Sequence, residues 1–263
     1  MSLSPAIVIG YAALIGLCVG SFLNVVVWRV PQGLSLRQPP SHCPSCSNAL
    51  AWRHNIPVLS WLLLRRRCHF CSAPISARYP LVEAGCAALF ALVVWVRSGP
   101  EAVAYCLAGA GMLALSIIDL EHYRLPDRVL GPTALLTLAA FTMASLVEGD
   151  LAALGRSLLG ALIGLASLGL IHVAQPQGMG FGDVKLAGLC GLLLGWRGLS
   201  YVPVGLFLAF MLGAVVGLAL LLGGRVGRKA RIPFGPFLCL SSLGAALVGG
   251  PLVQALGRLI LRR

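Results

Sequence analysis

Long apolar stretches fill most of this chain and restrict it to one class of fold. Hydrophobic residues make up 58% of its 263 residues and charged residues only 11%, and the mean hydropathy is +0.90. Crossing the hydrocarbon core of a bilayer, roughly 30 Å thick, takes about 20 apolar residues. The sequence therefore predicts an all-α polytopic membrane protein with about eight transmembrane helices. The apolar stretches are 4–27, 80–96, 101–118, 128–147, 153–174, 183–196, 199–222 and 234–257.

The basic residues predict how these helices are oriented. No Lys or Arg precedes Arg29, so the start lacks the basic region of a cleavable signal peptide, and we expect the first stretch to be a retained helix. Between the first two helices lie arginines and no acid, which by the positive-inside rule predicts a cytoplasmic loop and an external N-terminus. The basic loop 223–233 agrees with this orientation, whereas Arg258, Arg262 and Arg263 do not. The arginines of the first loop are Arg29, Arg37, Arg53, Arg65, Arg66, Arg67 and Arg78.

The net charge of +12 comes mostly from these loops, which can rest against anionic lipid head groups. We therefore expect membrane lipids as partners of the basic residues, and no nucleic acid. The pattern divides the chain into a first transmembrane helix (1–27), a cytoplasmic loop domain (28–79) and a transmembrane domain (80–263). The oligomeric state is left open.

The loop domain contains two CxxC pairs, formed by Cys43, Cys46, Cys68 and Cys71. Two such pairs predict a tetrahedral zinc site with four thiolate ligands, although the spacer between them is one residue longer than is usual for zinc ribbons. The loop has few large apolar side chains, so the metal would have a structural role and supply folding energy.

Other interpretations of these cysteines are two disulfides or a redox pair. Disulfides need an oxidising compartment, whereas the arginines predict a cytoplasmic loop, and a redox site needs only one pair. His42 or His69 could replace a thiolate, but four cysteines make this unnecessary. The remaining cysteines fall in apolar stretches, where they are expected to act as small hydrophobic residues.

Two aspartates are the leading candidates for chemistry. The chain has only eight acidic residues, and an ionisable group in mid-membrane costs on the order of 3 kcal/mol or more. Asp119 ends the apolar run Ile117-Ile118-Asp119, and Asp183 follows the glycine turn Gly180-Phe181-Gly182. The predicted topology places both at the cytoplasmic boundary. Two carboxylates at one membrane face suggest a dyad that hydrolyses an amide bond.

Each of these acids also has a structural interpretation. Asp183 could be a helix N-cap after its glycine turn. Asp119 could be an end-of-helix charge paired with Arg124. Asp127, which follows Pro126, is a candidate N-cap and the chief rival of Asp119 as the catalytic acid.

Two further charged residues are candidates for supporting roles. Lys185 could pair with Asp183, or bind a substrate carboxylate or a lipid phosphate. Glu83 opens the second helix, where the helix dipole favours an anion, or it could recognise a cationic end of a substrate.

The motifs, taken in order along almost the whole chain, resemble those of bacterial type IV prepilin peptidases. This family comprises integral-membrane aspartic proteases of pilus, type II secretion and competence systems. So many matching motifs in the same order do not arise by chance. Besides the double CxxC loop, the matching segments are Gly20-Ser-Phe-Leu-Asn24-Val-Val, Trp28-Arg29-Val-Pro31, Asn55-Ile-Pro57, Leu59-Ser-Trp61, Ser76 to Glu83, Asp119 to Asp127, Gly180-Phe-Gly182-Asp183-Val-Lys185 and Ile232-Pro-Phe-Gly235-Pro236.

The resemblance implies that Asp119 and Asp183, rather than Asp127, are the catalytic pair. Asp127 is then a supporting residue, as are Gly180, Gly182, Lys185 and Glu83. The family cleaves the short basic leader of prepilins and pseudopilins at the cytoplasmic face of the bacterial inner membrane. Members with the full cysteine loop typically also methylate the new N-terminal amine with S-adenosylmethionine. The loop has no glycine-rich nucleotide fingerprint, so the methyl-donor site is not predicted.

The implied mechanism uses two carboxylates that share a proton: the ionised acid activates water, and the protonated acid donates to the carbonyl oxygen. Two alternatives remain open at this point. One is a peptidase without methyltransferase activity. The other is a membrane carrier that combines redox thiols with an acid relay.

Overall fold

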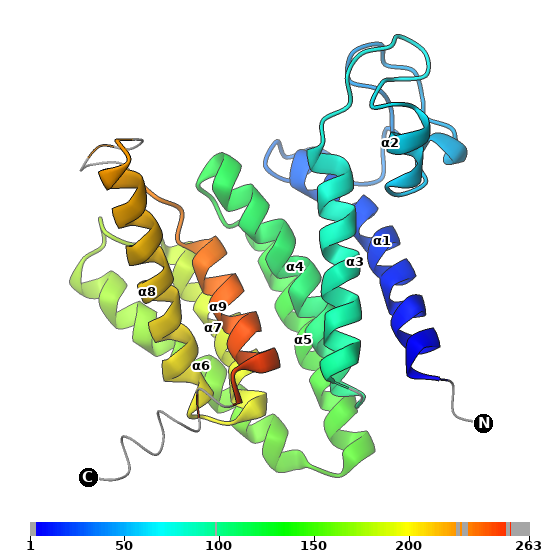
Figure 1. The fold of residues 1–263 in the computed structure, drawn as a ribbon. Helices are drawn as coiled ribbons and strands as arrows, with labels where there is room; N and C mark the ends of the chain where they lie inside the picture. Colours follow the sequence, from blue (N-terminus) through cyan, green and yellow to red (C-terminus); the bar gives the residue numbers. More distant parts are fainter. Residues whose placement is uncertain (1–3, 98, 225–226, 228–230, 251–252, 254–263) are drawn as a thin grey trace, which may run out of the picture. The chain divides into compact units, whose positions relative to one another are not determined.

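The computed structural model describes residues 4–97, 99–224, 227, 231–250 and 253, and within them the fold is helical without strands (Figure 1). All eight apolar stretches contain a helix, as predicted. Between the first helix, α1 (Pro5–Arg29), and α3 (Arg78–Val96) lie only a 3-10 turn, Trp52–His54, and the short helix α2, Leu59–Leu63. The long helices are α1 (Pro5–Arg29), α3 (Arg78–Val96), α4 (Glu101–His122), α5 (Asp127–Glu148), α6 (Leu151–Ala174), α7 (Phe181–Arg197), α8 (Tyr201–Leu222) and α9 (Gly235–Val248).

The predicted class of an all-α polytopic membrane protein is confirmed. Among the described residues, six helices are long and apolar enough to cross a membrane by themselves, namely α1, α3, α4, α5, α6 and α8. The other two are shorter, since α7 has 17 residues and α9 has 14. The C-terminal arginines that disagree with the predicted topology lie outside the described residues; they are Arg258, Arg262 and Arg263. The same holds for three basic residues of the loop 223–233, namely Arg225, Arg228 and Lys229.

The chain forms two compact units, Met1–Trp95 and Val96–Arg263. In the first unit, small residues let α1 and α3 approach closely. A Cβ atom added to Gly16 would stand 2.7 Å from the Cα of Ala87, and one added to Gly20 would stand 2.7 Å from the Cα of Glu83. Close backbone contact through small residues is a usual way for membrane helices to associate.

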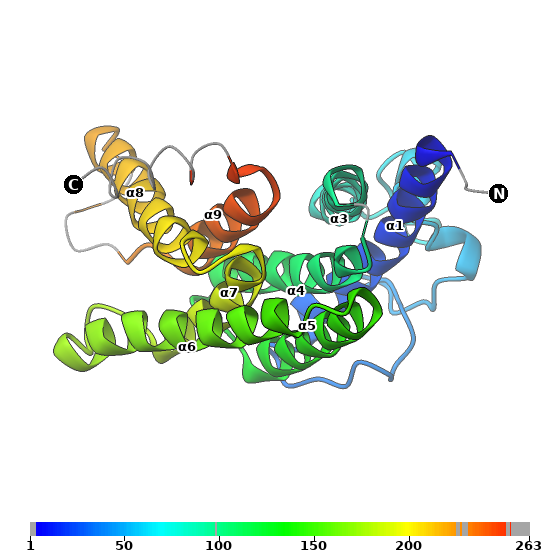
Figure 2. The same ribbon diagram turned by 90° about the horizontal axis from the view of Figure 1, so that it is seen from below.

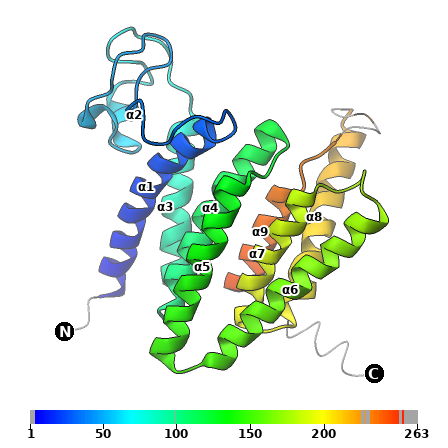
Figure 3. The same cartoon turned by 180° about the vertical axis from the view of Figure 1, so that it is seen from behind.

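In the second unit, α7 is the central helix. It contacts α4, α5, α6, α8 and α9, and nearly all of its residues from Val184 to Trp196 are buried (Figure 2). The C-terminal ends of α4, α6 and α8 lie at one end of this unit, as the predicted topology requires (Figure 3). Residues near the N-terminus of α7 therefore lie at the same end as the C-terminus of α4.

The α6–α7 contact is made by backbone rather than by side chains. A Cβ atom on Gly160 would overlap the carbonyl oxygen of Gly191, and a Cβ atom on Gly191 would overlap the carbonyl oxygen of Gly160. Beside them, the Ser157 hydroxyl donates to the carbonyl of Leu192 at 2.6 Å. No side chain fits at this crossing, so α6 supports α7 directly.

We expect Gly160→Leu to destabilise this unit strongly, because the new side chain can enter only by separating α6 from α7. Overpacking of this kind typically costs about 1–3 kcal/mol or more. The matched control is Gly155→Leu on the same helix, where an added Cβ meets nothing within 4 Å. Thermal unfolding in detergent measures the difference: Gly160→Leu should lower Tm and Gly155→Leu should not. Equal midpoints for the two variants would contradict the close contact.

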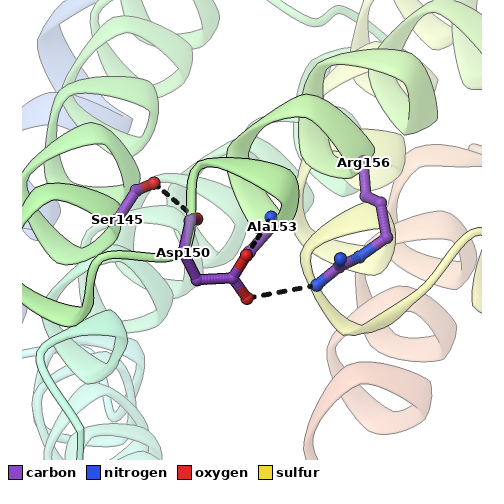
Figure 4. Close-up of polar contacts among 4 residues, drawn as sticks. All are labelled: Ser145, Asp150, Ala153 and Arg156. Carbon is purple, nitrogen blue, oxygen red and sulfur yellow. Dashed lines mark hydrogen bonds and ion pairs between the residues drawn. The ribbon is translucent and has the colours of Figure 1, made fainter.

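The turn between α5 and α6 lies at the opposite end of the second unit and is held by Asp150 (Figure 4). Its side chain accepts a hydrogen bond from the N–H of Ala153 at 2.9 Å, which makes it the N-cap of α6. Its carbonyl accepts from the Ser145 hydroxyl at 2.6 Å, and its carboxylate lies 3.6 Å from Arg156. This local network fixes the angle at which α6 leaves α5.

At that same end, Arg97 secures the last turn of α9. Its guanidinium donates to the carbonyls of Ala246 at 2.6 Å and Leu247 at 3.2 Å. The final carbonyls of a helix have no partner within the helix, so a cationic donor satisfies and stabilises them.

Candidate active site and metal centre

Asp119 lies in the last turn of α4, and the residue is only 6% exposed. Its Oδ2 accepts a hydrogen bond of 3.0 Å from the backbone N–H of Gly235, the first residue of α9. Within the described residues it makes no ion pair with Arg124, so the alternative of an end-of-helix salt bridge is wrong. The carboxyl group is instead buried against the start of another helix.

Asp183 is the third residue of α7, not its cap. The helix begins at Phe181, and the capping position is Gly180, whose extended conformation (φ −71°, ψ 144°) turns the chain into the helix. The alternative interpretation of Asp183 as an N-cap is therefore wrong. Its half-buried side chain is free of that role and lies near the N-terminus of α7, where a negative charge is favoured.

The structure brings the two predicted acids together. The charge of Asp119 acts electrostatically on the carboxyl of Asp183, and both act on the thiol of Cys239, which is buried on α9. The site thus combines the C-terminus of α4 with the N-termini of α7 and α9. Two neighbouring carboxyls can hold one proton between them, which allows one to act as a base while the other acts as an acid.

Leu125 fills the space between the two glycine turns of this site. An added Cβ on Gly182 would stand 3.0 Å from the Leu125 side chain, and one on Gly235 would stand 3.3 Å from it. The chain therefore needs small residues at both helix starts. The sequence predicts no role for Leu125 or Gly235, although both lie in segments that match the family, because nothing local links them to either acid.

Lys185 and Asp127 form an ion pair beside the candidate site. The Lys185 ammonium donates to both Asp127 carboxylate oxygens, at 2.7 and 2.8 Å. Lys185 therefore pairs with Asp127 rather than with Asp183. Asp127 is the first residue of α5 and makes no side-chain cap, so its predicted N-cap role is wrong. The pair joins the starts of α5 and α7, and its exposure limits its contribution to about 1 kcal/mol.

Glu83 lies in the first unit and has a partner there. Its carboxylate accepts a 2.6 Å hydrogen bond from the N–H of Val58, the residue before α2. Val58 has a positive φ of 60°, which is rare and costly for a β-branched residue. Glu83 thus ties α3 to the strained turn that starts α2.

The four predicted ligands converge on one point. Cys43, Cys46, Cys68 and Cys71 place their sulfur atoms within 4.8 Å of one another. The Sγ atoms of Cys43 and Cys71 are 3.8 Å apart, and a tetrahedral zinc site with Zn–S bonds of about 2.3 Å has sulfurs about 3.8 Å apart. The cluster could hold a metal ion. Neither histidine belongs to it: His42 contacts the carbonyl of Pro40, and the ring of His69 packs against His54.

Both cysteine pairs lie in turns of the same geometry. In the first, the N–H of Cys43 donates to Asn48 O and the N–H of Ser47 donates back to Cys43 O. In the second, Cys68 and Ser72 make the equivalent bonds, with Ala73 as acceptor. Ser47 and Ser72 share a positive φ, 56° and 57°. These matching turns present two thiols each from the same backbone shape.

The chemistry of the four thiols suits a cation. Burial raises the pKa of Cys43, but the backbone N–H groups of Ser45 and Cys46, together with the thiols of Cys68 and Cys46, lower it to about 6. For Cys71 a backbone N–H lowers the pKa, but burial and the three neighbouring thiols raise it to about 12. The first thiolate therefore forms readily and the last does not. A divalent metal resolves this conflict, because a coordinated thiol is deprotonated outright.

Comparisons with known proteins cover both units. Residues 14–97 match a family model described as the bacterial peptidase A24 N-terminal domain, and residues 106–218 match that of the type IV leader peptidase family. A prepilin leader peptidase/N-methyltransferase of Pseudomonas putida is 36% identical, with 95% of this chain and 93% of the relative covered. One of the same name from Aeromonas hydrophila is 35% identical, covering 92% of this chain and 91% of the relative. No solved structure matches the chain.

Proposed function

The chain belongs to the type IV leader peptidase family, and on that premise we propose that Asp119 and Asp183 are its catalytic pair. The protein is a membrane-embedded prepilin leader peptidase that also has N-methyltransferase activity. One observation carries the assignment of the pair. Two buried or half-buried acids, far apart in the sequence, lie in electrostatic contact at the ends of α4 and α7.

The proposed reaction is hydrolysis of a peptide bond by this pair. The ionised carboxyl takes a proton from water, and the water oxygen attacks the scissile carbonyl carbon. The protonated carboxyl donates its proton to the carbonyl oxygen. The amine then leaves with a proton from the acid that gained one in the first step. As the C–N bond breaks and the carbonyl re-forms, a hydroxyl of the tetrahedral intermediate returns its proton to the other carboxylate, so the pair ends with the one proton it began with.

The glycine turn before Asp183 supports access by an extended substrate. Gly180 carries no side chain, and an added Cβ there would stand 3.4 Å from Asp183 Oδ2, whereas the space beside Gly182 is filled by Leu125. A substrate backbone can therefore come close to the acid. We assign the exposed pair of Lys185 and Asp127 a supporting role, in which it fixes the start of α7 relative to α5.

We propose that Cys43, Cys46, Cys68 and Cys71 bind a structural Zn²⁺. The convergence of the four sulfurs supports this, and the alternatives of disulfides or a redox carrier are not favoured. The metal would hold the two turns of the loop together, because that segment has only short helical pieces, Trp52–His54 and Leu59–Leu63.

The methyltransferase activity would use S-adenosylmethionine, which supplies an activated methyl group to the new N-terminal amine. We propose prepilins and pseudopilins of a type IV pilus or type II secretion system as substrates. The arginines of the first loop support an inner-membrane orientation with the N-terminus outside and both the cysteine loop and the active site at the cytoplasmic face.

Mass spectrometry of a prepilin co-expressed with this chain tests the proposed function. We expect the pilin to lose its leader and to gain one methyl group at its new N-terminus. An unprocessed pilin would contradict the peptidase, and a processed but unmethylated pilin would contradict the second activity. A pilin expressed without the chain is the control.

A further inference from the structure

The first residue of α9 contacts one of the two acids. On the basis of the proposed function, we infer that Gly235 is a positioning residue of the active site. Its N–H holds the Asp119 carboxylate, and its missing side chain leaves the space that this carboxylate occupies. The start of α9 is thereby a third part of the catalytic site, beside the two acid-bearing helix ends.

The hydrogen bonds of the first turn of α9 explain why this N–H is available. The first N–H groups of a helix have no partner in its regular bonding pattern. Here Phe237 and Leu238 donate to the carbonyl of Phe234 at 3.1 and 3.2 Å, and Pro236 has no N–H. Phe234 offers no capping side chain. Within this described turn, Gly235 alone directs its N–H outward, and Asp119, 116 positions earlier, accepts it at 3.0 Å.

The space around Gly235 leaves no room for a side chain. An added Cβ atom would stand 2.7 Å from Oδ2 of Asp119 and 3.3 Å from its Cγ. Leu125 closes another side, at 3.3 Å. Any side chain at position 235 must therefore push the carboxyl of Asp119 away from the start of α9, and with it away from its present position near Asp183.

The contact also has an electrostatic consequence. The N-terminus of a helix carries a partial positive charge and stabilises an anion. The start of α9 faces Asp119, and the start of α7 carries Asp183. Two helix N-termini therefore stabilise the single negative charge that the two carboxyls share. Among the described residues, the Cys239 thiol on α9 is a titratable group that interacts electrostatically with both acids.

The test compares Gly235→Ala with Gly244→Ala, a change on the same helix where an added Cβ meets nothing within 4 Å. With a purified prepilin as substrate, Gly235→Ala should lower kcat by about 10- to 100-fold, since it disturbs one hydrogen bond to a charged group, and leave KM nearly unchanged. The acidic limb of its kcat/KM profile should move to higher pH, because the ionised form loses its donor. Gly244→Ala should match the parent in both respects.

Three results separate this inference from the proposed function. If Asp119→Asn cleaves prepilin like the parent, the proposed function itself fails. If Asp119→Asn is inactive while Gly235→Ala keeps the parent's kcat and pH profile, only the inference about Gly235 is overturned. A lower Tm with an unchanged pH profile also overturns it, since that is the signature of a merely structural helix cap.

A second variant covers the case in which Gly235→Ala yields too little folded enzyme. Replacing Gly235 by glycolate turns its N–H into an ester oxygen and adds no side chain. We expect the same loss of kcat and the same shift of the acidic limb. An ester variant with the parent's rate and profile would overturn the role of the N–H.

Discussion

Asp119→Asn and Asp183→Asn should each abolish cleavage of a co-expressed prepilin. Asparagine keeps the shape of the side chain and removes the group that transfers the proton, which typically costs about 10²- to 10⁴-fold in rate. Because the two acids act as a unit, the double variant should be no slower than either single variant. Leader removal measured by mass spectrometry or by gel shift checks all three variants.

The control for this experiment is Asp127→Asn, which disturbs only the exposed ion pair with Lys185. It should lower the rate far less than either catalytic variant. Membrane insertion and metal content should be the same for all variants, since the four proposed metal ligands are all cysteines. Full cleavage by Asp119→Asn together with an inactive Asp127→Asn would transfer the catalytic role to Asp127.

The double variant Cys43→Ser/Cys68→Ser should lose its metal and unfold the loop between α1 and α3. It removes one thiolate from each turn, and a structural zinc site contributes on the order of 10 kcal/mol to folding. Metal analysis of the purified protein should fall from one Zn²⁺ per chain to none, and limited proteolysis should cut within residues 30–77.

Cys18→Ser is the matched control, because this exposed cysteine lies on α1, outside the cluster. It should retain the metal and the proteolysis pattern of the parent. Stoichiometric zinc in the Cys43→Ser/Cys68→Ser variant would count against a site with four thiolate ligands. Disulfides in place of a metal would be revealed by a parent protein that contains no zinc and no reactive thiols in the loop.

Much of the fold could be predicted because membrane helices obey a strong local rule. An apolar stretch of the right length must form a helix, since its backbone groups have no water to bond with. All eight stretches follow it, including 183–196, whose short length matches the buried helix α7. The four candidate metal ligands could also be predicted, because the two cysteines of each CxxC pair lie at a fixed spacing within one turn.

The structure corrected the predictions where a partner lies far away in the sequence. Asp183, two positions before Lys185, was one of the partners that the sequence left open for it. Residues two apart in a helix do not face each other, and Lys185 reaches Asp127 instead. Asp127 and Asp183 both follow turn residues, yet each helix starts so that the acid falls inside it. No local pattern links Asp119 to Gly235, because their contact depends on how α4 and α9 pack.

The shortness of α7 and α9 has a consequence for the lipid around them. At 1.5 Å per residue they are about 25 and 21 Å long, whereas the hydrocarbon layer is roughly 30 Å thick. α7 begins two residues before Asp183, so a helix too short for the bilayer sets this proposed catalytic acid below the level of the phosphates, unless the lipid thins to meet it. The mismatch between helix length and bilayer thickness therefore affects the reaction. The acyl-chain length of the lipid sets how far water must travel from the membrane surface to reach the scissile bond.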